Sequence, residues 1–307
     1  MTRECVVALA ATPVALGALS SRLSRHAAVR LAPAAATVLL TAFALTVALS
    51  TGLLLCLAAV IALAETPGLS GLSHWSPGEL RAVVPVPAEA GAVGGVLAAV
   101  LLASAAVHLA RTVRDARRAS AVAASLPRSG GGLSVMENDA VIAYTIPGRH
   151  RRIVVSTGML RSLSAVQRRA LLAHETSHLR HRHHRYVQLA RLAAAANPLV
   201  RPVSRAVDLA VERWADENAA VEVGDRRTVA HALAAAALAS AAPGPAPPAG
   251  SLGGARTGVA DRVGFLLRPP VRHRLAYALV TAGIVLCWTA TCVAVGHIHG
   301  LMELAEA

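Results

Sequence analysis

Residues 174 to 178 read His-Glu-Thr-Ser-His, an H-E-x-x-H sequence. On a helix, histidines four residues apart lie on one face, so both imidazoles can reach one metal ion. The adjacent Glu175 is offset towards the open side of that ion, where a carboxylate can act as general base towards water. In this composition chance would supply only about 0.02 copies of the pattern. The motif therefore predicts a zinc site with hydrolytic capacity.

The residues around the motif predict the helix that it requires. Ser164 and Gln167 have the spacing of a capping box, which marks the start of a helix. No proline or glycine follows until well past His178. We expect a helix that begins after Ser164 and runs without interruption through His181.

Two histidines leave a zinc ion short of its usual three protein ligands, and two residues are candidates for the third. The first is His184, which has the spacing of the metzincin pattern H-E-x-x-H-x-x-G-x-x-H. His181 stands where that pattern has glycine. Glycine lets the chain leave the helix, whereas an uninterrupted helix would carry His184 to a different face.

The second candidate is Glu212, which begins the sequence Glu-Arg-Trp-Ala-Asp at residues 212–216. We place it on a helix from about residue 203 to residue 223. Glu212 and Asp216 share a face of this helix, so Glu212 could bind zinc while Asp216 accepts the other ring N–H of a ligand histidine. Alternatively, both acids are solvated and pair with neighbouring arginines. Because E-x-x-A-D follows the H-E-x-x-H by 34 residues, as in gluzincins, we favour Glu212.

The two motifs together resemble the membrane-embedded metallopeptidases of the BlaR/MecR type, relatives of the HtpX and CAAX-prenyl endopeptidases. The similarity covers roughly residues 135 to 268 and includes flanking segments at 140–148, 152–160 and 260–267. The resemblance implies three zinc ligands, a general base and an outer partner: His174, His178 and Glu212 as ligands, Glu175 as base, Asp216 as partner.

Hydropathy predicts a membrane protein. The mean hydropathy is +0.53, and 55% of the residues are hydrophobic. Three long runs and one shorter run carry no charge: Leu31–Ala64, Ala90–Ala110, Leu275–Gly296 and Cys5–Ser21. Because a bilayer core needs about 20 apolar residues, we expect four transmembrane helices. Their expected ranges are about 5–21, 33–63, 90–110 and 275–296.

The segment between the third and fourth spans predicts a folded domain. Strands are expected at residues 140–146 and 152–156, joined through Pro147-Gly148, followed by the two metal helices and a helix at about 228–241. A Pro/Gly-rich stretch at 243–254 predicts a loop. The expected fold class is a mainly α membrane protein of four transmembrane helices with an inserted α+β gluzincin-type metallopeptidase domain carrying a small β-sheet. The expected divisions are a membrane region (1–110), the peptidase domain (111–274), the fourth helix (275–296) and a short external tail (297–307).

Charges in the short links predict the orientation. The link at 21–30 has three arginines, the link at 65–89 has three glutamates against one arginine, and the tail has two glutamates. By the positive-inside rule, the N-terminus and C-terminus lie outside and the peptidase domain faces the cytoplasm. We expect a multi-pass protein of a bacterial plasma membrane.

The basic character of the chain, with a formal net charge of +13, has two interpretations. Binding of nucleic acid would be the more specific interpretation, but aromatic residues that could stack on bases make up only 3%. A basic face also suits a domain held beneath an anionic leaflet of the lipid bilayer. We therefore expect no nucleic-acid partner, and we expect His181, His183 and His184 to be solvated on this basic surface.

The predicted activity is zinc-dependent hydrolysis of peptide bonds in a protein or peptide substrate. In the resembled family, such enzymes act on cytoplasmic transcriptional repressors and carry an antibiotic-binding sensor after the last span. Only 11 residues follow Gly296, so we expect no sensor domain. One alternative is membrane-protein quality control as in HtpX-type enzymes. Another is a non-catalytic signalling protein with a structural zinc, which would have no need of Glu175.

Two further hypotheses concern the substrate. If the strand at 152–156 is a sheet edge, an extended peptide could add to it and lie across the metal. His231 is a candidate for stabilising the oxyanion, although a lone histidine in an alanine-rich helix is more often at the surface.

Overall fold

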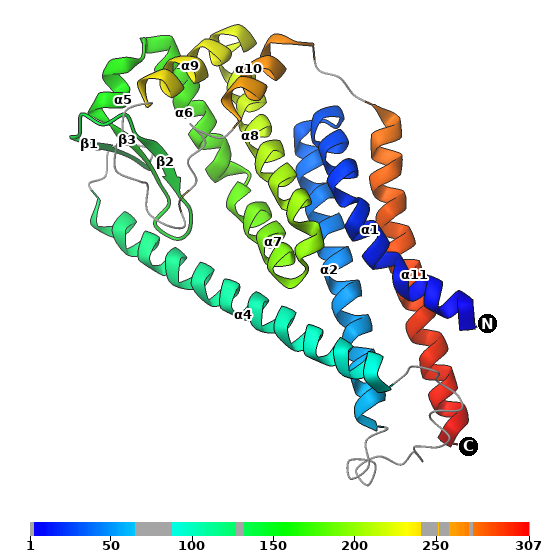
Figure 1. The fold of residues 1–307 in the computed structure, drawn as a ribbon. Coiled ribbons are helices and arrows are strands. Elements are labelled where there is room, and N and C mark those ends of the chain that lie inside the picture. Colours follow the sequence, from blue (N-terminus) through cyan, green and yellow to red (C-terminus); the bar gives the residue numbers. More distant parts are fainter. Residues whose placement is uncertain are drawn as a thin grey trace.

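The structure is a computed structural model, which describes residues 3–64, 88–126, 132–240, 251, 258–269 and 273–306. A small sheet lies at one end together with α5 (Thr157–Ser162), α6 (Ala165–Arg180) and α9 (Arg226–Ala239) (Figure 1). Three long helices lie at the other end: α1 (Arg3–Arg30), α2 (Pro33–Ala64) and α11 (Arg274–Glu306). Between the two ends lie α7 (His183–Ala196) and α8 (Arg201–Val223). The predicted fold class is confirmed in its mainly helical character and its small sheet. The predicted loop at 243–254 lies outside the described residues, except for Ser251.

Four helices are long and apolar enough to cross a membrane, by length and composition. They are α1 (Arg3–Arg30), α2 (Pro33–Ala64), α4 (Ala88–Ser125) and α11 (Arg274–Glu306). Their apolar parts span Val7–Arg30, Pro33–Leu63, Glu89–Ser125 and Arg274–Gly300. These four helices suggest a multi-pass membrane protein, as the uncharged runs predict.

Three of these helices, α1, α4 and α11, continue past the ends of their predicted transmembrane ranges. The predicted ten-residue link after Ser21 is wrong, because α1 continues to Arg30 and only two residues separate it from α2. Arginine is a good helix former, and no glycine or proline interrupts this stretch. Residues 297–306, predicted as a tail, continue α11. α4 extends beyond the uncharged run at 90–110 to Ser125 and reaches the sheet.

One apolar core joins the long helices to the folded domain. Leu40, Phe43 and Val47 of α2 are fully buried and belong to the same cluster as Val203 and Val207 of α8. α7 (His183–Ala196) contributes small residues to this cluster and packs against α2 and α4. The domain is therefore packed directly onto the apolar bundle.

The sheet has three strands, one more than the sequence predicts. β1 (Leu133–Met136) pairs parallel with β3 (Arg152–Ser156), and β2 (Ala143–Ile146) pairs antiparallel with it, in the order β1-β3-β2. The β2–β3 hairpin is the predicted one. The hypothesis that the strand at 152–156 is an edge is wrong, because β1 occupies its second side. The edge nearest the metal helices is β2, which contacts α6.

The helices of the domain follow their local signals, with one exception. They are α5 (Thr157–Ser162), α6 (Ala165–Arg180), α7, α8 (Arg201–Val223), α9 (Arg226–Ala239) and α10 (Val259–Leu267). The capping box of Ser164 and Gln167 is present. The predicted uninterrupted helix through His181 is wrong, since α6 ends at Arg180 and Arg182 adopts a left-handed conformation with φ 53°. This break starts α7 in a new direction at His183.

Gly158 permits a close approach that any side chain would block. Its amide donates to the carbonyl oxygen of Asn138 at 2.9 Å, and a Cβ at this position would lie 2.1 Å from the carbonyl oxygen of Asp139. We expect Gly158→Ala to lower the free energy of unfolding by about 1–3 kcal/mol, because the backbone must shift. The melting temperature of the purified full chain measures this.

The matched control is Gly264→Ala on α10, where an added Cβ meets nothing within 4 Å. Alanine is the better helix former, so this variant should melt no lower than the wild type. Equal melting temperatures for the two variants would contradict the steric argument.

Candidate metal centre

Three side chains from two helices converge at the centre of the domain. α6 carries His174 and His178 on one face, and α8 carries Glu212 opposite them. The Nε2 atoms of the two histidines are 3.1 Å apart. Nε2 of His174 is 3.5 Å from Oε2 of Glu212, and Nε2 of His178 is 3.6 Å from Oε1. All three residues are buried, and their ligand atoms lie within 4.8 Å of one another.

These residues fit a tetrahedral metal ion such as zinc. Two histidines and one glutamate are a donor set of catalytic zinc sites, which keep a fourth position open. Bonds of about 2.0–2.1 Å at tetrahedral angles separate ligand atoms by about 3.3 Å, close to the distances found here. Oε2 of Glu212 is buried and lies between Nε2 of His174 and Nη1 of Arg262, at 3.5 and 3.0 Å. The structure thus brings together the three residues that the sequence predicts as ligands.

Asp216 lies where the sequence predicts the partner of a ligand histidine. Its Oδ1 is 3.0 Å from Nδ1 of His174, so the ring donates there and Nε2 is left to face the metal position. Burial alone would lower the pKa of His174, but the carboxylates of Asp216 and Glu212 outweigh it and raise the pKa to about 10. A metal ion that binds this ring must therefore displace a proton from it.

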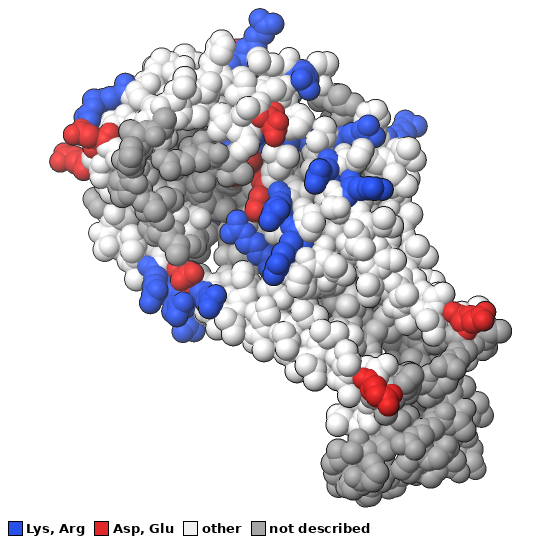
Figure 2. Space-filling view, in the orientation of Figure 1, with Lys and Arg blue, Asp and Glu red and all other residues white. Residues whose placement is uncertain are grey.

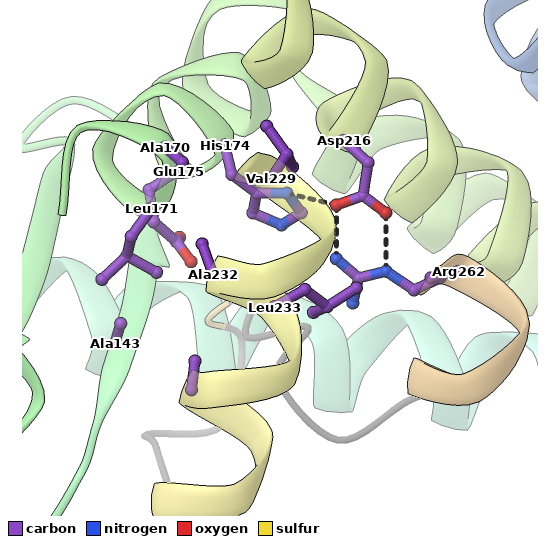
Figure 3. A pocket seen from close by; sticks show the side chains of 11 residues that line it. Ala143, Ala170, Leu171, His174, Glu175, Asp216, Val229, Ala232, Leu233 and Arg262 are labelled. Atoms are coloured by element: carbon purple, nitrogen blue, oxygen red, sulfur yellow. Dashed lines mark hydrogen bonds and ion pairs between the residues drawn. The ribbon is translucent and has the colours of Figure 1, made fainter. Parts of the chain in front are cut away.

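Arg262 of α10 is a central residue of the site that sequence reasoning missed. Its Nε and Nη2 donate to the two carboxylate oxygens of Asp216 at 2.8 and 2.7 Å (Figure 3). Its Nη1 is 3.0 Å from Oε2 of Glu212, and the side chain is only 1% exposed. Burial would raise the pKa of both carboxyls, but Arg262 helps to hold both pKa values below their usual range. The only sequence signal was an arginine in the otherwise mostly apolar segment at 260–267.

His183 was predicted to be solvated, and this prediction is wrong. The side chain is fully buried, and its Nδ1 lies 3.0 Å from Nδ1 of His178. If His178 binds metal through Nε2, its Nδ1 carries the proton and donates to His183. Burial, and then the neighbouring His178, lower the pKa of His183, which favours the neutral ring that this bond requires. His184, on the same turn of α7, lies outside the metal group.

Glu175 lines a small cavity of about 40 Å³, together with His174, Asp216 and Arg262. The walls come from α6, α8, α9, α10 and β2, and most of the labelled lining residues are apolar (Figure 3). The Thr145 hydroxyl of β2 donates to the Glu175 carboxylate. Burial is the main cause that raises the pKa of Glu175. His231 is exposed and does not line this cavity, whereas Ala232 of the same helix does.

The apolar helices together with this site indicate a membrane protein with the metal centre of a metallopeptidase. Residues 108–191 match the sequence model of peptidase family M48, and the match supports a metallopeptidase of this kind. The matched part includes His174, Glu175 and His178 and ends before Glu212. Comparison with curated proteins and with solved structures gave no match.

The third ligand can be tested by removing each candidate in turn. We expect Glu212→Ala to weaken zinc binding by at least about 100-fold. Even the loss of a residue that only hydrogen-bonds to a metal ligand lowers metal affinity by about 10–100-fold. His184→Ala should bind zinc as the wild type does. Competition with a chromophoric chelator on the purified full chain measures both affinities. Zinc loss in His184→Ala with retention in Glu212→Ala would reverse the assignment.

The bond between His178 and His183 gives a second test. We expect His183→Leu to weaken zinc binding by about 10–100-fold, because the ring of His178 loses its acceptor. His183→Asn can supply an amide oxygen as acceptor and should recover part of this affinity. The same chelator competition measures both variants, and melting temperatures check their folding. Equal zinc affinity of the leucine and asparagine variants would exclude a role for the hydrogen bond.

Proposed function

We propose that the protein is a zinc-dependent endopeptidase of the membrane, with Glu175 as general base. The observation that carries this proposal is a buried carboxylate beside a His-His-Glu group. Glu175 and His174 line the same cavity, and Arg262 and Asp216 complete its polar side. The match to peptidase family M48 supports the same class of reaction.

The residues of the chain would share the chemistry as follows. A bound zinc ion polarises a carbonyl group and makes water acidic near neutral pH. Glu175 takes a proton from the attacking water and returns it to the leaving amine. The raised pKa of Glu175 strengthens it as a base, and the Thr145 hydroxyl holds its carboxylate in place. Asp216 and His183 fix the ring protons on the sides of the histidines that face away from the metal position.

The substrate would be an extended peptide that adds to the β2 edge. β2 is hydrogen-bonded to β3 on one side, and its Ala143 lines the cavity with Glu175. Backbone hydrogen bonds to an edge strand would hold the peptide irrespective of sequence. The apolar side chains of Leu171 and Leu233 in the same cavity would favour an apolar residue next to the cleaved bond.

The biological role that we propose is regulatory proteolysis of a cytoplasmic repressor or a membrane protein, as the BlaR/MecR resemblance implies. The peptidase domain, residues 111–274, would face the cytoplasm of a bacterium. In Figure 2 the basic side chains of the described residues lie toward the upper and left parts of this face, and acidic groups lie toward its lower right. This distribution agrees with the positive-inside rule. Quality-control proteolysis of the HtpX type is the alternative for the same chemistry.

Glu175→Gln tests the chemistry. We expect this variant to keep its zinc and to lose peptidase activity by at least about 100-fold, because the amide cannot accept the proton. Zinc content and cleavage of casein by the full chain in lipid nanodiscs measure the two effects. Glu137→Gln, at an exposed position, is the matched control and should cleave as the wild type does.

Two outcomes would contradict the proposal. Equal cleavage by the wild type and Glu175→Gln would remove Glu175 from the reaction. Zinc binding without cleavage of casein, of peptides or of the chain itself would favour the non-catalytic alternative, a structural zinc in a signalling protein.

A further inference from the structure

A second, larger cavity lies at the junction between the long helices and the domain. Its volume is about 440 Å³, and it opens where α1 ends, α2 begins and α10 packs on α8. The cavity is separate from the metal group, and no member of that group lines it. Its charged and titratable lining residues are Arg30, Arg213, Glu217, Arg226, Arg268 and His273.

The lining carries a large excess of positive charge. Four arginines and one histidine face a single carboxylate, that of Glu217, so the arginines leave three charges uncompensated by the lining. Glu217 accepts a hydrogen bond from Nη2 of Arg226 at 2.7 Å, so its carboxylate is already partly engaged by one of the four arginines. Arginines brought together from α1, α8, α9 and the end of α10 repel one another unless an anion lies between them.

Arg213 indicates where such an anion would bind. Its side chain is buried, with a residue exposure of 8%, and its Nη1 donates to the carbonyl oxygen of Ala28 near the end of α1. The guanidinium lies 4.4 Å above the ring of Phe265. Among the described residues, Nε of Arg213 and Nε of Arg226 are buried without a hydrogen-bond partner. Buried N–H groups are costly to leave unpaired, and the oxygens of a phosphate or a carboxylate form strong charge-assisted hydrogen bonds with arginine.

A third cavity continues the basic one along the apolar helices. It has a volume of about 320 Å³ and lies between α1 and α11. The two cavities share Arg30 and His273. Beyond these two residues the walls include leucines that are more than half exposed: Leu19 at 57%, Leu275 at 68% and Leu279 at 52%. Arg22 and His26 also line this groove, but most of its wall is apolar. It meets the charged cavity at the ends of two membrane-capable helices.

We propose that this junction binds one anionic phospholipid. Its phosphate headgroup lies in the cavity of Arg30, Arg213 and Arg268, and an acyl chain lies in the groove between α1 and α11. Basic pockets between transmembrane helices are typical sites for anionic headgroups. A free phosphate ion would satisfy the arginines but would leave the leucine groove uncovered. The adjoining apolar groove therefore favours a lipid over a water-soluble phosphate. This proposal does not depend on peptidase activity.

The experiment measures lipid binding by the purified full chain in detergent micelles. The probe is fluorescent phosphatidylglycerol, and the competitors are unlabelled phosphatidylglycerol, phosphatidylcholine and inorganic phosphate. We expect unlabelled phosphatidylglycerol to displace the probe, and the other two to require at least about tenfold higher concentrations. Displacement by inorganic phosphate as effectively as by phosphatidylglycerol would overturn the lipid assignment, and equal displacement by phosphatidylcholine would overturn the requirement for charge.

The site is tested with a double variant at two exposed arginines of the lining. Arg30→Gln with Arg268→Gln removes two headgroup contacts and should weaken phosphatidylglycerol binding by about 30-fold. The matched control is Arg149→Gln with Arg151→Gln, two exposed residues between β2 and β3, which should bind as the wild type does. Wild-type affinity in the first double variant, or equal losses in both, would overturn the proposed site.

Discussion

The metal centre depends on the guanidinium of Arg262, which lies between two buried carboxylates. Glu212 must be ionised to bind a metal ion, and Asp216 must be ionised to accept the proton of His174. Both side chains are withdrawn from water, where an unpaired carboxylate would take up a proton instead. Arg262 contacts both at 2.7–3.0 Å and lets them remain charged. Because breaking a buried pair costs about 3–5 kcal/mol, the docking of α10 is part of the site.

α8 connects this centre to the rest of the molecule. Consecutive residues on a helix point in different directions, so Glu212 faces the histidines while Arg213 faces the end of α1. Arg213 also packs on Phe265, which lies one turn after Arg262 on α10. The cavity proposed for a lipid therefore shares α8 with the metal group and α10 with Arg262. An anion bound at Arg213 would favour the position of α10 that brings Arg262 to the carboxylates.

The local features were predictable from the sequence, and the tertiary ones were not. The capping box, the uncharged runs and the i, i+4 pairs His174/His178 and Glu212/Asp216 each depend on residues close together in the sequence. The helices, and the helix faces that carry the candidate ligands, could therefore be predicted. β1 has only four residues and acquires its role by pairing with a strand twenty residues later. The break at Arg182 has no glycine to signal it. Arg262 lies 46 residues from Asp216, and nothing local indicates their contact.

The long helices also support the proposed base. α4 leaves its apolar stretch and packs Ala119 and Ala123 against Tyr144 and Ile146 of β2. Between those two strand residues stands Thr145, whose side chain points to the opposite face and bonds to Glu175. Movement of α4 relative to α2 would shift this hydroxyl and with it the carboxylate. Since α1 supports α8 and α4 supports β2, the carboxylates of Glu212 and Glu175 are both positioned by helices that begin in the apolar bundle. A bilayer would therefore act on the site as a structural support, beyond anchoring the domain.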